Sequence, residues 1–168
     1  KRGTCTALCA YPTNKGAPRF IPIKKTKVST IKTEKDMITI LAEKPSIARE
    51  IARIIGAMKR EEGYFTGNGY HVTWALGHLV QLALPDGYGV KGFRRDSLPV
   101  IPERFELIPR QVKTDKGYKA DAAAVKQIKV ITKLWNESDG IIVATDCARE
   151  GELIFRYLYT YIGCTLPF

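Results

Sequence analysis

The sequence predicts an α/β fold in which helices flank a central, mostly parallel sheet. Two short apolar runs, at 38–42 and 141–144, are each followed by an acidic residue and then by apolar residues at helical spacing. Buried parallel strands read as such uninterrupted runs, because both of their faces are covered. Two strand–turn–helix units of this kind are typical of an α/β sheet.

The first unit begins with the run at 38–42, which ends at Glu43 and Lys44. Pro45 suits the first turn of a helix, since its φ is already helical and its missing N–H would have no partner there. We expect this helix to bury one stripe of isoleucines at the i, i+4, i+7, i+8 spacing. The stripe consists of Ile47, Ile51, Ile54 and Ile55. Gly56 is expected to end the helix.

A hairpin and then a long loop are predicted after the first unit. Asn68 and Gly69 separate two β-rich runs, at 64–66 and 70–74, and an Asn-Gly pair in this position is a strong hairpin signal. The stretch 85–104 contains three prolines and several glycines. Such residues interrupt regular structure, so we expect a surface loop or an insertion there.

A second helix leads into the second unit. After a predicted strand at 105–108, the segment 121–135 has apolar residues at helical spacing. The residues expected to face inward are Val125, Ile128, Ile131, Leu134 and Trp135. A turn at 138–140 then opens the strand at 141–144, and Asp146 follows the end of that strand.

The turn after the second strand concentrates charged residues, namely Asp146, Arg149, Glu150 and Glu152. Ligands of open α/β sheets bind at the carboxyl ends of strands, where Asp146 lies. If the helix begins near Cys147, Glu150 lies one turn beyond Asp146 on the same face. Carboxylates so close repel one another or need a cation, and Mg²⁺ typically takes one or two carboxylates together with substrate phosphate. The alternative is structural: Asp146 caps the helix, and the glutamates complement its dipole.

The two units, placed side by side in one parallel sheet, would bring Glu43 beside Asp146. Alone, Glu43 and Lys44 would form an ordinary solvated ion pair. Their place at the carboxyl end of a neighbouring strand makes both of them candidates for the same site as Asp146.

The net charge is unevenly distributed along the chain. The whole sequence carries +10, of which residues 1–36 contribute +7 and residues 37–168 contribute +3. Residues 1–36 are rich in lysine, contain three prolines and show no periodicity. We expect them to be a basic, disordered or non-native leader, or else a basic arm that touches nucleic acid. Residues 37–168 are expected to form the folded domain, and the basic balance favours a nucleic-acid partner.

Neither a membrane segment nor a zinc site is expected. No apolar run approaches the length of a membrane span, and the N-terminus lacks a signal-peptide core. Cys5 and Cys9 have no nearby histidine or second cysteine pair to complete a zinc site. Cys147 and Cys164 read as ordinary reduced thiols. We therefore expect a cytoplasmic protein with no membrane partner.

Four motifs together resemble the N-terminal Toprim domain of type IA DNA topoisomerases, most closely that of topoisomerase III. They occur in the order in which the family carries them and cover roughly residues 37 to 168. The motifs are AEKPS at 42–46, VTWALGHL at 72–79, LPVIP at 98–102 and ATDCAREGE at 144–152. The resemblance implies a Rossmann-like sheet with an acidic centre that binds Mg²⁺.

The resemblance also implies the topoisomerase reaction. A tyrosine attacks one DNA strand and holds its 5′ phosphate, another strand passes, and the break is resealed. Glu43 would then donate a proton to the leaving 3′ oxygen and take part in metal binding. Lys44 would contact the scissile phosphate, and Asp146 and Glu150 would bind Mg²⁺.

Three further residues have implied roles, and one position departs from the family. Arg149 would act with the catalytic residues and contact DNA, Glu152 would support the cluster or the DNA, and His78 would approach the DNA backbone. Most of the superfamily has a second aspartate where this chain has Ala148. The change removes one ligand and so argues against a second metal ion.

The nucleophilic tyrosine of the family lies in a downstream domain, and none of the eight tyrosines here stands in its motif. Tyr157, Tyr159 and Tyr161 are expected to be packing residues. The chain is therefore expected to be a fragment. It would act with C-terminal domains of the same polypeptide on DNA, especially single-stranded DNA, and a helicase is a further candidate partner. Two alternatives stay open: another Toprim enzyme, such as a metal-dependent nuclease or primase-like protein, and a non-catalytic nucleic-acid-binding domain.

Overall fold

The computed structural model describes residues 37–90, 95–115 and 117–168. These residues belong to one compact unit, Glu34–Phe168. The leader expected at 1–36 lies outside the described residues. Within the described part of the chain, no helix is both long enough and apolar enough to cross a membrane.

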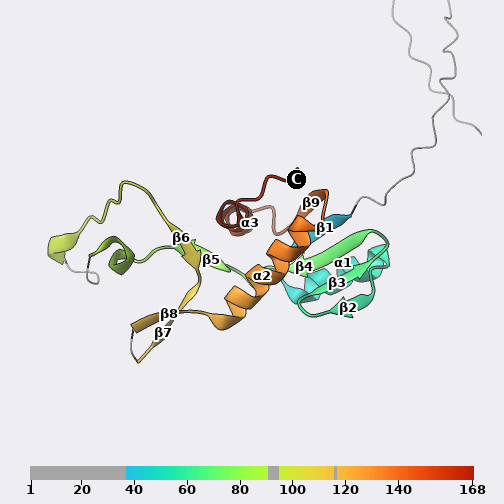
Figure 1. The fold of residues 1–168 in the computed structure, drawn as a ribbon, viewed down its shortest axis with the longest axis horizontal. Coiled ribbons are helices and arrows are strands. Elements are labelled where there is room, and N and C mark those ends of the chain that lie inside the picture. The colour runs from blue at the N-terminus through green and yellow to red at the C-terminus, as the bar shows by residue number, and fades with distance from the viewer. Residues whose placement is uncertain (1–36, 91–94, 116) are drawn as a thin grey trace, which may run out of the picture. The chain divides into compact units, whose positions relative to one another are not determined.

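A five-stranded sheet forms the centre of the fold, with the strand order β2-β3-β4-β1-β9 (Figure 1). Its strands are β1 (Ile38–Ala42), β2 (Lys59–Glu61), β3 (Tyr64–Gly67), β4 (Tyr70–Trp74) and β9 (Gly140–Ala144). β1 lies between β4 and β9 and is parallel to both, whereas β2 and β3 pair in antiparallel fashion. The two strands predicted from the apolar runs are therefore neighbours in a parallel arrangement.

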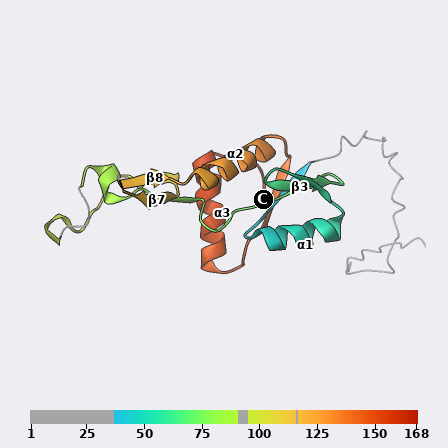
Figure 2. The ribbon, with the colours of Figure 1, turned by 90° about the horizontal axis from the view of Figure 1, so that it is seen from below.

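Three helices cover the sheet: α1 (Pro45–Ile55), α2 (Ala122–Asn136) and α3 (Arg149–Ile162). Successive residues of β1 point to opposite faces. Leu41 packs in the core with α2 and α3, while Ile40 and Ala42 pack in a second core with α1. Hence α1 covers one face of the sheet, and α2 and α3 cover the other (Figure 2). The predicted α/β architecture is confirmed.

The inward face of α1 contains only part of the predicted isoleucine stripe, because Ile51 and Ile55 are half-buried against the core but the other two isoleucines are exposed. Ala48 and Ala52 are buried, but Ile47 is 48% exposed and Ile54 is 75% exposed. The two exposed isoleucines stand about 100° around the helix from Ala48, on a flank that the sheet does not cover. Small alanines let the helix axis come close to the sheet, and this close approach decides which face is buried. The expected stop at Gly56 is confirmed, since this residue takes the left-handed conformation that ends the helix.

The inward face predicted for α2 is confirmed. All five predicted residues are buried or half-buried: Val125, Ile128, Ile131, Leu134 and Trp135. The helix also buries Gln127, whose side-chain amide donates to the carbonyl of Trp74 at 2.9 Å. This bond ties α2 to the end of β4.

The tyrosines of α3 pack only in part as predicted. Tyr157 and Tyr159 pack against the core that α2 and α3 share. Tyr161 is 39% exposed, so the prediction that it packs is wrong. It follows Tyr159 by two positions, which places it on nearly the opposite side of the helix.

The hairpin predicted from the Asn-Gly pair joins β3 to β4. Asn68 (φ 52°) and Gly69 (φ 83°) both take left-handed conformations, as a two-residue hairpin loop requires. The side-chain amide of Asn68 donates to the carbonyl of Ile55 at 2.9 Å and so ties the hairpin to the end of α1.

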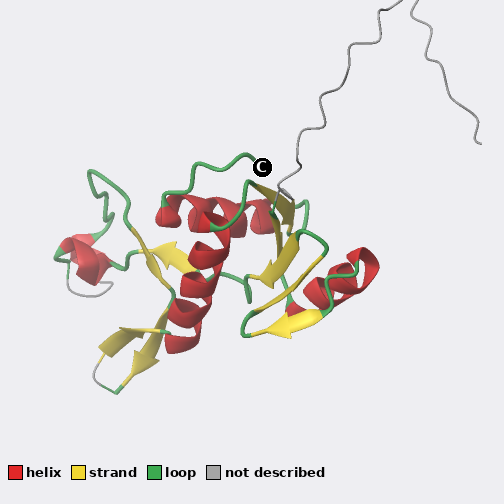
Figure 3. Ribbon diagram, turned by 45° about the vertical axis from the view of Figure 1, so that its right-hand side comes forward, coloured by secondary structure: helices red, strands yellow, loops and turns green. Residues whose placement is uncertain are grey.

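Two small antiparallel ribbons lie between β4 and α2 in the chain (Figure 3). β5 (Val80–Leu82) pairs with β6 (Leu107–Pro109), and β7 (Gln111–Thr114) pairs with β8 (Gly117–Ala120). The strand predicted at 105–108 is β6, which starts two residues late because Phe105 is exposed and unpaired with β5. In the loop predicted at 85–104, the described residues form two short 3₁₀ turns, Pro85–Tyr88 and Arg95–Ser97.

Candidate metal and nucleic-acid site

The carboxyl ends of β1 and β9 lie side by side. The register pairs Ala42 with Ala144, so Glu43 and Asp146 follow neighbouring parallel strands at the same edge of the sheet. The sequence predicted this arrangement. The side chain of Glu43 is only 17% exposed, and Lys44 Nζ lies 3.7 Å from its Oε1. Asp146, by contrast, is exposed.

The start of α3 sets the relation between Asp146 and Glu150. Its first residue is Arg149, and Ala148 is its N-cap. The helix thus begins within two residues of Cys147, and Asp146 lies in the turn before it. The alternative that Asp146 caps the helix is wrong, because the cap position belongs to Ala148.

Gly151 packs closely against the turn that precedes α3. A Cβ atom at position 151 would lie 2.1 Å from the carbonyl oxygen of Asp146 and 2.7 Å from its nitrogen. Only glycine leaves room for the backbone of the turn at this distance. Gly151 is not among the predicted site residues, although a glycine within a helical pattern is the signal that points to it.

The two helices that begin at this edge of the sheet lack side-chain caps. Lys44 precedes α1 and Ala148 precedes α3, and neither side chain bonds to the first turn. α2 is different, because Oδ1 of Asp121 accepts a hydrogen bond from the N–H of Ala123 at 2.9 Å. Uncapped N–H groups at a helix start carry partial positive charge and favour an anion such as phosphate.

His78 reaches the acidic residues from the connection between β4 and β5. Its Nε2 lies 2.5 Å from Oε1 of Glu150, and its ring centroid lies 6.4 Å from that of Tyr157. Leu76 (φ 51°) and Gly77 (φ 72°) are both left-handed, so the chain turns sharply just before His78. The resemblance implies that His78 contacts DNA and that Glu150 binds a metal ion. The structure brings the two side chains into direct contact.

The other predicted residues lie on the surface. Lys44 is 64% exposed and Arg149 is also exposed, so both present positive charge to solvent. Glu152 Oε1 accepts a hydrogen bond from Arg156 Nε at 2.6 Å, four residues along α3. Glu152 is therefore engaged in a pair along the helix.

The donor set at this edge consists of carboxylates. Glu43, Asp146 and Glu150 offer the oxygen ligands that Mg²⁺ prefers, so the residue types fit a hard cation. Among residues 37–90, 95–115 and 117–168, no three His, Cys, Asp or Glu side chains are already grouped as metal ligands. Glu150 also contacts His78 at this edge.

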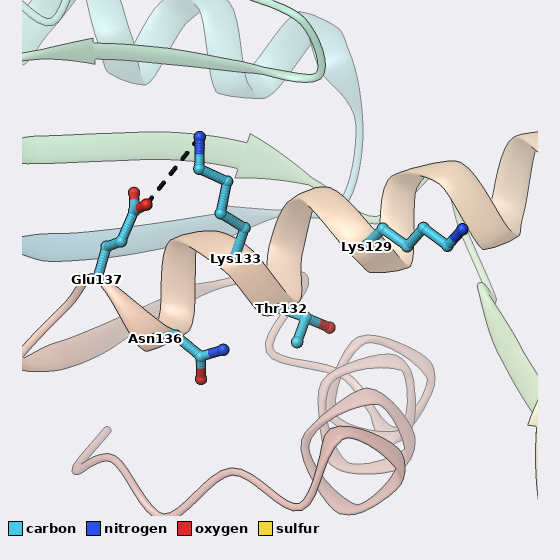
Figure 4. Close-up of a pocket in the computed structure, with 5 residues that line it drawn as sticks. All are labelled: Lys129, Thr132, Lys133, Asn136 and Glu137. Atoms are coloured by element: carbon cyan, nitrogen blue, oxygen red, sulfur yellow. Dashed lines mark ion pairs between the residues drawn. The ribbon is translucent and has the colours of Figure 1, made fainter.

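A separate open pocket of about 420 Å³ lies over α2 (Figure 4). Its lining residues are Lys129, Thr132, Lys133, Asn136 and Glu137. Lys133 Nζ lies 4.0 Å from Glu137 Oε1, which makes an ordinary surface pair along the helix. None of these residues follows a strand of the parallel part of the sheet. The acidic edge is therefore the better candidate for chemistry.

Comparison with known proteins identifies the family of this chain. The Toprim domain family matches residues 38–167. The DNA topoisomerase 3 of Bacillus licheniformis is 43% identical over 130 residues, which are 76% of this chain and 17% of that protein. Those of Shouchella clausii and Bacillus subtilis are 41% and 42% identical, and each match covers 71% of this chain and 15% of the relative. The chain thus spans 15–17% of the length of these relatives, and the resemblance carried by the four motifs is confirmed.

Proposed function

The chain belongs to the Toprim domain family, and from this premise we propose that it is the Mg²⁺-binding, amino-terminal part of a type IA DNA topoisomerase. The observation that carries the proposal is the register of β1 and β9, which sets Glu43 and Asp146 at one edge of the sheet. Similarity to proteins named DNA topoisomerase 3 supports it. The reaction would be cleavage, passage and resealing of a DNA strand, with the tyrosine supplied by another part of the whole protein.

Toprim domains bind a divalent metal ion, generally Mg²⁺. In this chain Glu43, Asp146 and Glu150 would hold it. When bound, such an ion neutralises charge on the phosphate oxygens next to the reacting phosphorus. The exposed Lys44 and Arg149 would add positive charge at the same edge, and the uncapped starts of α1 and α3 would add N–H donors.

Glu43 is the proposed proton donor. Its carboxylate is sheltered, and Lys44 Nζ lies 3.7 Å from it, so one DNA phosphate can meet both side chains. As the tyrosine hydroxyl gives its proton to solvent and its oxygen bonds to phosphorus, the bond from phosphorus to the 3′ oxygen breaks, and Glu43 in its protonated form would pass its proton to that oxygen. Lys44 would hold the phosphate during the exchange, and His78 would contact the backbone nearby.

Single-stranded DNA is the proposed substrate, and the cytoplasm is the proposed location. Lys44 and Arg149 supply positive charge at the acidic edge, and residues 37–168 carry +3 in all. Contacts to backbone phosphates release counterions from the DNA. The affinity for a single-stranded oligonucleotide should therefore fall as the salt concentration rises.

Mg²⁺-dependent binding of a single-stranded oligonucleotide by this chain, followed by fluorescence anisotropy, tests the proposal. We expect Mg²⁺ to strengthen binding and Asp146→Asn to remove that effect, because the variant loses a charged oxygen ligand. Glu103→Gln is the matched control, since Glu103 is an exposed carboxylate in the loop before β6. It should keep the response to Mg²⁺.

Two other outcomes would replace the proposal. If millimolar Mg²⁺ has no effect on oligonucleotide binding, the chain is a non-catalytic nucleic-acid-binding domain. The loss of one aspartate at Ala148 is the feature that favours this reading. If the chain by itself nicks DNA with Mg²⁺, and Asp146→Ala abolishes nicking, a Toprim nuclease is the better assignment.

A further inference from the structure

Arg110, which lies between β6 and β7, joins the turn that carries His78 to the start of α2. Its Nη1 donates to the carbonyl oxygens of Leu76 and His78, both at 3.3 Å. On the other side of the guanidinium, Nε and Nη2 donate to Oδ2 of Asp121 at 3.0 and 2.5 Å. The backbone follows the same path: the N–H of Arg110 donates to the carbonyl of Leu79, and the N–H of Asp121 donates to the carbonyl of Arg110, each at 2.8 Å.

The turn before His78 has a backbone conformation that needs support. Leu76 is left-handed, which is unfavourable for a residue with a branched side chain, and Gly77 is left-handed as well. Such a conformation persists only where the surroundings impose it. The guanidinium of Arg110 binds the two carbonyl groups that flank Gly77, and so supports the turn at both sides.

Asp121 fixes the guanidinium to the core of the domain. The hydrogen bond from Arg110 lowers the pKa of the Asp121 carboxyl, so the carboxylate that holds the guanidinium stays charged to a more acidic pH than an ordinary aspartate. The same carboxylate caps α2 through the N–H of Ala123. Arg110 is thus anchored on a helix that packs against the sheet, and a rigid element holds a side chain more accurately than a loop does.

The supported turn also connects the two halves of the candidate site. At its start, the N–H of Ala75 donates to the carbonyl of Ala42 at 2.9 Å, and Ala42 immediately precedes Glu43. At its end, His78 contacts Glu150 on α3. A shift of this turn would therefore move His78 relative to both Glu43 and Glu150.

We propose that Arg110 is a positioning residue of the site: held by Asp121, it fixes the turn at 76–78 and so presents the imidazole of His78 to Glu150 and the strand ends. The part that concerns DNA rests on the proposed function. The part that concerns the orientation of His78 rests on the geometry alone. Neither Arg110 nor Asp121 lies in one of the four motifs.

Nuclear magnetic resonance of the whole chain tests the orientation of His78. The chain has two histidines, and the buried His71 serves as an internal reference for folding. We expect the Overhauser contact between the rings of His78 and Tyr157 to be lost in Arg110→Gln, while His71 keeps its native chemical shifts. Arg110→Lys keeps the positive charge but loses the planar guanidinium group that donates in several directions. We expect the contact between His78 and Tyr157 to be weakened in this variant.

Arg53→Lys is the matched control. Arg53 pairs with Glu50 through the same two nitrogens, Nε and Nη2, but on the exposed side of α1. This variant should leave the signals of both histidines unchanged. A normal contact between His78 and Tyr157 in folded Arg110→Gln would overturn the proposal.

If Arg110→Gln unfolds the chain, the chemical shifts of His71 will depart from their native values. The Arg110→Lys variant then decides whether Arg110 positions His78. A weakened contact between His78 and Tyr157 with native His71 shifts supports positioning. An unchanged contact, or unfolding of this variant too, overturns it, since unfolding assigns Arg110 to folding alone.

Oligonucleotide binding separates this inference from the proposed function. We expect Arg110→Gln to weaken Mg²⁺-dependent binding about tenfold, the size of one lost charge-assisted hydrogen bond. If the unaltered chain shows no such binding, the proposed function fails, and the resonance result still decides the role of Arg110 in orienting His78. Normal DNA binding by a variant that has lost the His78 contact would overturn the link between positioning and DNA.

Discussion

The two strand–turn–helix units have the same order of elements, with an acidic residue after each strand, but their turns differ in length and in the exposure of that residue. After β1, two residues separate the strand from α1, and Glu43 is sheltered there beside Lys44. After β9, four residues separate the strand from α3, and Asp146 is exposed in the longer turn. Glu43 is therefore sheltered by its surroundings, whereas Asp146 lies on a turn whose backbone packs against the first turn of α3.

The difference comes from where the small residues stand. In the first unit, Ala48 and Ala52 let α1 approach the sheet. In the second unit, Gly151 lets the first turn of α3 approach the backbone of Asp146. A close approach of backbones therefore decides where each acid sits, and the acids themselves do not.

The largest effect is expected at Gly151. In Gly151→Ala the new Cβ would meet the carbonyl oxygen of Asp146 at 2.1 Å, so the backbone of the turn has to shift. We expect the free energy of unfolding to fall by about 1–3 kcal/mol, the usual cost of overpacking. Urea unfolding followed by tryptophan fluorescence measures it. Mg²⁺-dependent oligonucleotide binding should also be lost, because Asp146 moves.

Gly140→Ala is the control for this prediction. Gly140 begins β9, and a Cβ there would meet its nearest neighbour, the carbonyl oxygen of Pro167, at 3.6 Å, an ordinary contact. This variant should unfold at nearly the original urea concentration. Equal stability of the two variants would show that Gly151 does not hold the turn.

A smaller effect on the free energy of unfolding is expected from pH, and it arises beside β1, in the first of the two units. His71 lies on β4, where it pairs with Thr39 of β1, and its burial lowers its pKa. The unfolded chain takes up a proton at His71 near pH 6.5, the ordinary value, while the native chain does so only at lower pH. The stabilisation is therefore complete above about pH 6.5 and declines below it, by at most about 1.4 kcal/mol per pH unit.

Urea unfolding at pH about 7.5 and about 5.5, on either side of the ordinary histidine pKa, measures this effect. The free energy of unfolding should be lower at the acidic value, and His71→Gln should reduce the difference. A pH dependence that is the same in His71→Gln would place its origin in other groups.

The smallest effect concerns Ala148, the N-cap of α3. Ala148→Asn should stabilise the chain by about 1 kcal/mol without any metal, because an asparagine accepts a hydrogen bond from the first turn. Ala148→Asp should give the same gain and should also bind Mg²⁺ more tightly, since it adds a charged ligand beside Asp146. Thermal unfolding and calorimetric titration with Mg²⁺ measure the two effects. Equal Mg²⁺ affinity of the two variants would show that position 148 lies outside the metal site.

Much of the fold could be predicted because the signals are local. The apolar runs of β1 and β9 indicate buried parallel strands, and the Asn-Gly pair indicates the hairpin between β3 and β4. The inward face of α2 follows from the spacing of its apolar residues. Each of these signals depends on the backbone conformation or periodicity of a few neighbouring residues.

The errors occur where distant segments meet. Ile47 and Ile54 have the spacing of a buried stripe, but the sheet covers the alanine side of α1 instead. The close packing of Gly151 against Asp146 was not predicted. The motifs placed His78 and Glu150 at one site, but they gave no reason to expect direct contact between the two side chains.

By itself, the sequence determined which residues stand at the ends of β1 and β9, and hence that Glu43 and Asp146 share an edge of the sheet. Only the tertiary structure decided which distant side chains meet at this edge, such as His78 beside Glu150. The physical reason is that contacts between distant segments depend on how closely backbones can pack. Small residues such as Gly151 set that distance, and nothing in their own chemistry marks them as part of a site.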